Sequence, residues 1–104
     1  MSTLRAGMLT FDSVAPMPTI LRERGWRLFF YADEGHEPIH VHARKGEAEC
    51  KFWLLRPLAT IEEAWSYNLT PRLEREIKQL ILSHFDVIAQ AWDDFFGVDE
   101  NADN

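Results

Sequence analysis

Cysteine, glycine-rich motifs and long apolar runs are scarce or missing in this chain of 104 residues. Cys50 is the single cysteine, which excludes a disulfide scaffold and a zinc site of paired cysteines and fits a reducing cytoplasm. No apolar run approaches the roughly 18 residues that a membrane span needs, and no sustained apolar stretch follows Arg5. We therefore expect no membrane partner and no secretory signal. The lack of a glycine-rich phosphate loop excludes the common nucleotide-binding motifs.

Positive charge is also in short supply, because the formal net charge is −6. That total argues against a protein that coats nucleic acid through bulk charge. Residues 57–104 hold three basic and ten acidic residues, whereas residues 22–56 hold seven basic and six acidic residues. The uneven distribution predicts two surfaces with different partners, unless the acidic half is simply a solvated helix face.

Length and composition predict one folded domain. The apolar fraction of 46% and the charged fraction of 27% are typical of a globular chain. Residues 1–16 show no periodicity and are predicted as a flexible N-terminal extension, so Met17 is an alternative start to Met1. Residues 17–97 are the predicted single α+β domain, and residues 98–104 are predicted as an acidic disordered tail.

Strand patterns fill the first two thirds of that domain. Aromatic density predicts a strand at 26–32, and alternation predicts two more at 39–44 and 47–55. Lys45-Gly46 joins the last two, because glycine supplies the positive φ of a tight turn. Residues 58–65 fit a strand or a helical turn, and we favour a strand because Asn68 can take a left-handed turn conformation.

The strict alternation at 39–55 predicts the pairing and the two faces of this hairpin. A turn at 45–46 predicts three cross-strand pairs: Arg44 with Glu47, His42 with Glu49, and His40 with Lys51. One face is apolar and faces the core: Ile39, Val41, Ala43, Ala48, Cys50, Phe52 and Leu54. The other face is polar and is expected to point outward: His40, His42, Arg44, Glu47, Glu49, Lys51 and Trp53. If Trp26, Leu28 and Phe30 face the core, then Arg27, Phe29 and Tyr31 join the histidine face.

One long helix is predicted at the C-terminal end. Thr70 can cap it, Pro71 suits its first position, and Gly97 suits its end. Apolar residues at steps of three or four form a single stripe: Leu73, Ile77, Leu80, Ile81, Phe85, Ile88, Trp92, Phe95 and Phe96. A helix of about 26 residues is about 39 Å long, longer than a small sheet. The helix therefore bends near Ser83-His84, or one end projects and pairs with a second copy of the chain. The predicted fold is α+β, a three- or four-stranded antiparallel meander packed on this helix.

The histidine face offers two kinds of chemistry. His40 and His42 project about 7 Å apart on one strand face, a spacing that suits one metal ion if Glu49 or His36 is the third ligand. Alternatively, both are half-exposed histidines that hydrogen-bond to neighbours such as Glu49.

The same face also suits RNA. In a metal-independent ribonuclease without a cofactor, His40 and His42 would act as base and acid, and Arg44 or Lys51 would stabilise the phosphorane. Three aromatic side chains would stack on bases: Phe29, Tyr31 and Trp53. The competing interpretation is that Glu47 and Glu49 neutralise this face and a second chain covers its rings. Cys50 and His84 are expected to serve in packing.

From Met17 to Gly97 the chain resembles a bacterial family called domain of unknown function 4160. The resemblance is carried by five elements: the opening Met17-Pro18-Thr19-Ile20, the strand Gly25-Trp26-Arg27-Leu28-Phe29-Phe30-Tyr31, Glu37-Pro38-Ile39-His40-Val41-His42, the Lys45-Gly46 turn followed by Lys51-Phe52-Trp53-Leu54, and Trp92. Ile39 stands where the family often has proline.

Members of this family are small proteins that are often encoded beside another short gene, as toxin–antitoxin pairs are. The resemblance therefore implies a toxin-like component of a two-protein module, with the neighbouring gene product as a partner. The histidine face, rather than the resemblance, makes RNA its expected target. A non-catalytic protein-interaction module and a small metal-binding protein are the alternatives.

Overall fold

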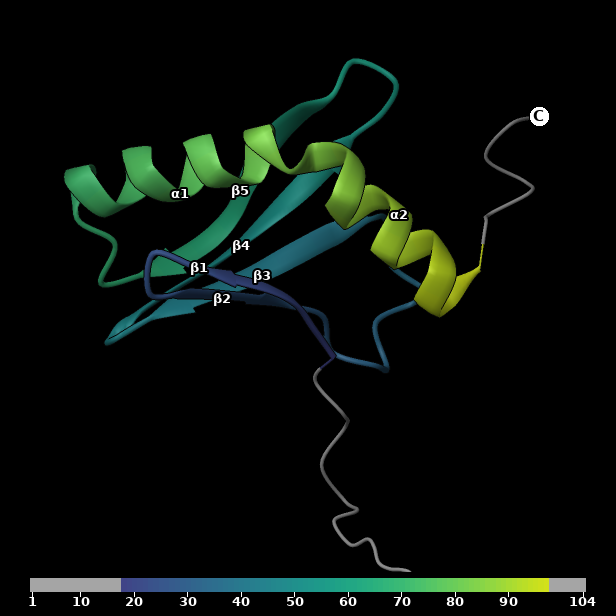
Figure 1. Ribbon diagram of the computed structural model, residues 1–104, viewed down its shortest axis with the longest axis horizontal. Coiled ribbons are helices and arrows are strands. Elements are labelled where there is room, and N and C mark those ends of the chain that lie inside the picture. Colours follow the sequence, from purple (N-terminus) through teal and green to yellow (C-terminus); the bar gives the residue numbers. More distant parts are fainter. Residues whose placement is uncertain (1–17, 98–104) are drawn as a thin grey trace, which may run out of the picture.

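The computed structural model describes residues 18–97, which form one antiparallel sheet and two helices (Figure 1). The five strands lie side by side in chain order: β1 (Thr19–Glu23), β2 (Trp26–Phe29), β3 (His40–Lys45), β4 (Ala48–Leu55) and β5 (Thr60–Tyr67). The helices are α1 (Pro71–Ser83) and α2 (Phe85–Phe96). The predicted α+β class and the antiparallel meander are confirmed. The predicted extension 1–16 and tail 98–104 lie outside the described residues.

The sheet has one strand more than the three or four predicted. β5 confirms the strand that we favoured for residues 58–65, while β1 was not predicted. β1 is a short edge strand with an irregular register between Thr19 and Leu21, so it shows little alternation. The turn that follows β1 is the feature that defines the hairpin, because Arg24 and Gly25 both have positive φ there, at 55° and 82°. Two such residues between two runs of chain are typical of a tight hairpin.

The predicted single helix is divided into two at His84, the bend position that we anticipated. His84 has φ −113° and ψ 21°, outside helical values. The carbonyl of Leu80 accepts a hydrogen bond from Ser83 Oγ at 3.0 Å and lies 3.1 Å from His84 Nδ1. These side chains compete for backbone groups that a continuous helix would use. The helix therefore changes direction, and α2 passes over the sheet end where β2 connects to β3 (Figure 1).

Both predicted helix boundaries are confirmed. Thr70 caps α1, since its Oγ1 accepts a hydrogen bond from the Leu73 amide at 3.2 Å, and Pro71 occupies the first turn. Gly97 ends α2 with φ 87°. No helix in residues 18–97 is long and apolar enough to cross a membrane.

The β3–β4 hairpin keeps the predicted faces in a different register. Its turn is at Gly46-Glu47, so Arg44 pairs with Glu49, His42 with Lys51 and His40 with Trp53. The predicted partners are therefore wrong by two residues. A shift of two residues leaves every side chain on its face, because side chains alternate with period two.

The helices cover one face of the sheet and build the core there (Figure 1). All seven predicted core-facing residues of the hairpin lie in or against this core, as do Trp26, Leu28 and Phe30 of the first predicted strand. Phe95 is the exception in the helix stripe, because 48% of its surface is exposed. The opposite face of the sheet carries no helix of the described chain.

Candidate functional site

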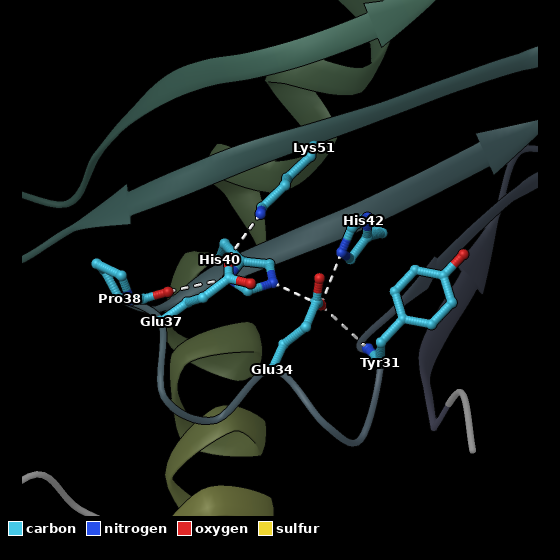
Figure 2. Close-up of polar contacts among 7 residues, drawn as sticks. All are labelled: Tyr31, Glu34, Glu37, Pro38, His40, His42 and Lys51. Atoms are coloured by element: carbon cyan, nitrogen blue, oxygen red, sulfur yellow. Dashed lines mark hydrogen bonds and ion pairs between the residues drawn. The ribbon is translucent and has the colours of Figure 1, made fainter. Parts of the chain in front are cut away.

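His40 and His42 lie on the predicted face of β3, but they are buried rather than exposed. Their relative exposures are 0% and 2%, so the expectation of outward-pointing imidazoles is wrong. The chain between β2 and β3, residues 30–39, folds back over them and brings Glu34 against their rings (Figure 2). Alternation predicted the side of the ribbon, but it carries no information on whether a connecting loop covers that side.

Glu34 joins the two histidines. Its Oε1 atom lies 2.8 Å from His40 Nε2 and 2.8 Å from His42 Nε2 (Figure 2). Turn hydrogen bonds hold Glu34 in place, because its amide donates to the Tyr31 carbonyl and its own carbonyl accepts from the Glu37 amide. We call the three residues Glu34, His40 and His42 the histidine site.

Glu34 was missed in the sequence, where residues 33–38 only connect the predicted strands 26–32 and 39–44. The two acids at Glu34 and Glu37, just before an alternating His-x-His pair, were the available pattern. Neither of the predicted third ligands, Glu49 and His36, belongs to the group of residues that converge here.

The second nitrogen of each histidine meets a different environment. His40 Nδ1 lies 2.9 Å from the Pro38 carbonyl oxygen. A carbonyl oxygen only accepts, so this nitrogen carries a hydrogen. His42 Nδ1 is buried and has no hydrogen-bond partner among the described residues. Pro38 thereby orients the His40 ring, whereas in the part of the chain that the structure describes only the Nε2 atom of His42 has a polar partner, Glu34.

Aromatic side chains enclose both imidazoles. Phe29 stacks on His42 with ring centroids 5.4 Å apart, and Tyr31 meets the same ring edge-on at 4.7 Å. His40 lies between Trp53 and Trp92, at 5.4 Å and 5.0 Å. Trp92 comes from α2, so the last helix closes one side of the histidine site.

Burial and hydrogen bonding set the ionisation of this group. Burial lowers the pKa of His42, and the neighbouring Glu34 carboxylate opposes that effect only in part. Burial alone raises the pKa of Glu34, but the close contacts of its carboxylate with the imidazoles of His40 and His42 outweigh that effect, so this pKa is lowered. Both shifts favour an ionised Glu34 beside a neutral His42 near neutral pH.

The predicted cations Arg44 and Lys51 lie on the same face, and each is paired with an acid. Lys51 Nζ lies 2.7 Å from Glu37 Oε1 and 4.5 Å from the centre of the Trp53 ring. Arg44 is exposed and contacts Glu49 at 3.2 Å. These pairs agree with the interpretation in which acids neutralise the positive charge of this face. The two acids are Glu37 and Glu49, whereas Glu47 and Glu49 were expected.

Aromatic side chains also spread across the uncovered face of the sheet. Phe29 is fully buried under Arg27, whose guanidinium lies 4.5 Å from the ring centre. Tyr31 and Trp53 are half-buried, so two of the three predicted stacking residues retain accessible rings. β5 adds Trp65 opposite Lys51 and Tyr67 opposite Glu49. We call this surface the aromatic face: Arg27, Phe29, Tyr31, Arg44, Lys51, Trp53, Trp65 and Tyr67.

Trp65 and Tyr67 were not predicted as site residues. They are two positions apart in an alternating segment, which was the available pattern. Tyr67 is 66% exposed, the most accessible ring of the aromatic face.

Cys50 takes the structural role that we predicted. It is fully buried in the core, and burial, with smaller contributions from Glu63 and Glu49, raises the pKa of its thiol to about 12. A thiol with that pKa is not a nucleophile near neutral pH. His84 likewise serves in the bend between the helices, and its Nε2 lies 3.2 Å from a carboxylate oxygen of Glu23.

Comparison with known protein families gives a match over most of the domain. Residues 25–93 match the model of a family described as a domain of unknown function, DUF4160. No curated protein and no solved structure matches the chain significantly. The matched range includes β2, the loop with Glu34, both histidines and most of the two helices.

Proposed function

This chain belongs to the DUF4160 family, and we propose that it is the partner-binding component of a bacterial two-protein module of toxin–antitoxin type. The aromatic face is its contact surface, and a second protein is the occupant. The chain thus acts as a protein-interaction module rather than as a ribonuclease.

The observation that supports it is the composition of a sheet face that no described helix covers. Four accessible rings, Tyr31, Trp53, Trp65 and Tyr67, lie there beside two arginines, Arg27 and Arg44. Tyrosine, tryptophan and arginine are the residues that contribute most binding energy in protein interfaces. Rings on a rigid sheet lose little conformational freedom on binding, so such a surface suits a stable protein partner.

The charges on this face favour a protein over RNA. Cations and acids balance on this side of the sheet or at its rim: the four cations are Arg22, Arg27, Arg44 and Lys51, and the four acids are Glu34, Glu37, Glu49 and Glu62. RNA binding needs excess positive charge to displace counterions from phosphates, and this face has none. His40 and His42 lie beneath the loop 30–39 and reach no phosphodiester unless that loop moves away, so ribonuclease action stays a prediction.

The test is a binding titration between the chain and the product of the neighbouring gene. Tyr67→Ala and Arg44→Ala each truncate an accessible side chain of the aromatic face. A residue at the centre of an interface costs roughly 2 kcal/mol when truncated, so we expect about 30-fold weaker binding for at least one variant. Phe95→Ala, which removes an exposed ring on α2, is the matched control and should bind like the wild type.

Two results would count against this function. Equal affinity of Tyr67→Ala, Arg44→Ala and Phe95→Ala would place the contact elsewhere. Tight binding of a labelled single-stranded RNA, weakened by Tyr67→Ala, would make RNA the occupant.

Growth arrest on expression that is silenced by the neighbouring gene product would identify this chain as the toxin of the pair. Circular dichroism would confirm that each variant is folded.

A further inference from the structure

Three potential metal ligands converge in one buried site: His40 Nε2, His42 Nε2 and a carboxylate oxygen of Glu34. The geometry points to a binding site for a divalent first-row transition metal ion such as zinc(II). These three ligand atoms all lie within 4.8 Å of one another. The site differs from the expectation of no cofactor, and it does not depend on the partner-binding function of the aromatic face.

The spacing of the ligand atoms is close to that of a metal site. Tetrahedral zinc with bonds of about 2.0–2.1 Å holds its ligand atoms about 3.3 Å apart. The carboxylate oxygen lies 2.8 Å from each imidazole nitrogen. A movement of Glu34 by about 0.5 Å would admit the ion, and Glu34 sits on a loop rather than within the sheet.

The hydrogen bonds of His40 favour a cation at this position. Because its Nδ1 donates to the Pro38 carbonyl, a neutral His40 has its lone pair on Nε2. That lone pair points at Glu34 Oε1, which is also an acceptor, across 2.8 Å. Two acceptors at this distance repel each other unless a further proton or a metal ion lies between them. In metal sites, a histidine ligand usually donates its other ring nitrogen to a carboxylate, a backbone carbonyl or water.

The rings are already held in position for binding. His40 and His42 alternate on one strand, and contacts with Phe29, Trp53 and Trp92 fix their planes. A rigid ligand pair loses little freedom when the ion enters. The ion would tie Glu34, and with it the loop 30–39, to β3.

The donor set selects the class of metal. Two imidazoles and one carboxylate suit zinc(II) and its transition-metal neighbours, whereas magnesium and calcium prefer oxygen ligands throughout. Three protein ligands leave a fourth position, as in zinc sites that hold a water molecule. Glu34 is the ligand with solvent access, since 16% of its side chain is exposed, so the fourth position is expected on its side.

The test uses the full chain without a polyhistidine tag, treated with a chelator and titrated with zinc(II) against a competing indicator. We expect one zinc ion per chain and, with cobalt(II), the visible absorption of a tetrahedral complex. Glu34→Gln keeps the size of the side chain but removes the anionic ligand. Loss of a residue that only hydrogen-bonds to a metal ligand costs about 10–100-fold in metal affinity. Because Glu34 is itself a ligand, we expect its replacement to weaken zinc binding roughly 100-fold or more. His36→Ala is the matched control, because His36 is an exposed histidine of the same loop.

Three results would overturn this site. Wild-type chain that takes up neither zinc(II) nor cobalt(II), Glu34→Gln with unchanged zinc affinity, or His36→Ala with an equal loss would each exclude the ligand set. If Glu34→Gln does not fold, the uptake of zinc(II) and cobalt(II) by the wild-type chain decides whether the site exists. Zinc at a hundredfold excess over its Kd should raise Tm by about 10 °C or more and slow amide exchange in residues 31–38, and neither change should occur if the site is absent. Failure of partner binding, tested with Tyr67→Ala and Arg44→Ala, would leave these readouts unaffected.

Discussion

Gly35 is the point at which the loop that carries Glu34 touches α2, and we expect Gly35→Ala to weaken both the fold and the histidine site. A Cβ atom at this position would lie 2.5 Å from Cδ1 and 3.1 Å from Cε1 of Phe96. Ordinary contact begins at 3.4 Å, so the loop or the ring must move by about 0.9 Å. Because Glu34 is the adjacent residue, a moving loop carries the carboxylate away from both histidines.

The Phe96 ring cannot yield easily. Its centroid lies 4.2 Å from that of Trp92, 4.8 Å from that of Phe95 and 5.7 Å from that of Phe30. Overpacking of this kind costs roughly 1–3 kcal/mol, and the lower entropy of the unfolded alanine chain offsets about 0.4–1 kcal/mol of that. The net loss of about 1–2 kcal/mol corresponds to a fall in Tm of about 5–15 °C for a domain of this size.

Urea denaturation followed by tryptophan fluorescence measures this loss, and a double-mutant cycle with Phe96→Ala tests its origin. In the Phe96→Ala background the added methyl group has space, so Gly35→Ala should cost less than about 0.5 kcal/mol there. Equal costs in the two backgrounds, or a Gly35→Ala variant as stable as the wild type, would show that the loop does not rest on α2 as described.

The remaining predictions concern ionisation, the buried thiol and the helix cap. The pKa of His42 is lowered in the folded chain, so protonation of His42 favours the unfolded chain, and stability should fall as the pH drops below 6.5 towards the folded pKa. The lowered pKa of Glu34 should add a second loss of stability below pH 4.5. Urea denaturation of chelator-treated protein that does not change between pH 7.5 and 4 would contradict this prediction. With a pKa of about 12, Cys50 should resist a thiol reagent at pH 8 until urea unfolds the chain, and fast labelling of folded protein would place it outside the core. Thr70→Ala should cost about 1 kcal/mol in urea denaturation because it removes the cap on the Leu73 amide, whereas Thr70→Ser should stay within about 0.5 kcal/mol of the wild type.

Local patterns predicted several features of the candidate site correctly. The alternation of His40, Val41 and His42 placed both imidazoles on one face, with the valine in the core. That result survived a register that was wrong by two residues, since only an odd shift changes the face. Phe29, Tyr31 and Trp53 were likewise assigned to the correct side of the sheet.

The same patterns could not predict the burial of that face. Glu34 reaches His40 and His42 because residues 30–39 close back over β3, and Trp92 reaches His40 because α2 changes direction at His84. No repeating pattern of residues in the sequence predicts either event. Each depends on contacts between segments that lie far apart in the chain, such as Gly35 against Phe96.

The amino-acid sequence by itself determined the strand and helix types, the helix ends at Thr70 and Gly97, and the face of each β3 and β4 side chain, because these follow from backbone geometry within a few residues. Only the tertiary structure decided that two helices replace one, that β1 adds an edge to the sheet, and that the His-x-His pair is enclosed with Glu34. Whether a face is exposed or covered depends on which distant segment packs on it, and that choice is made by the whole fold.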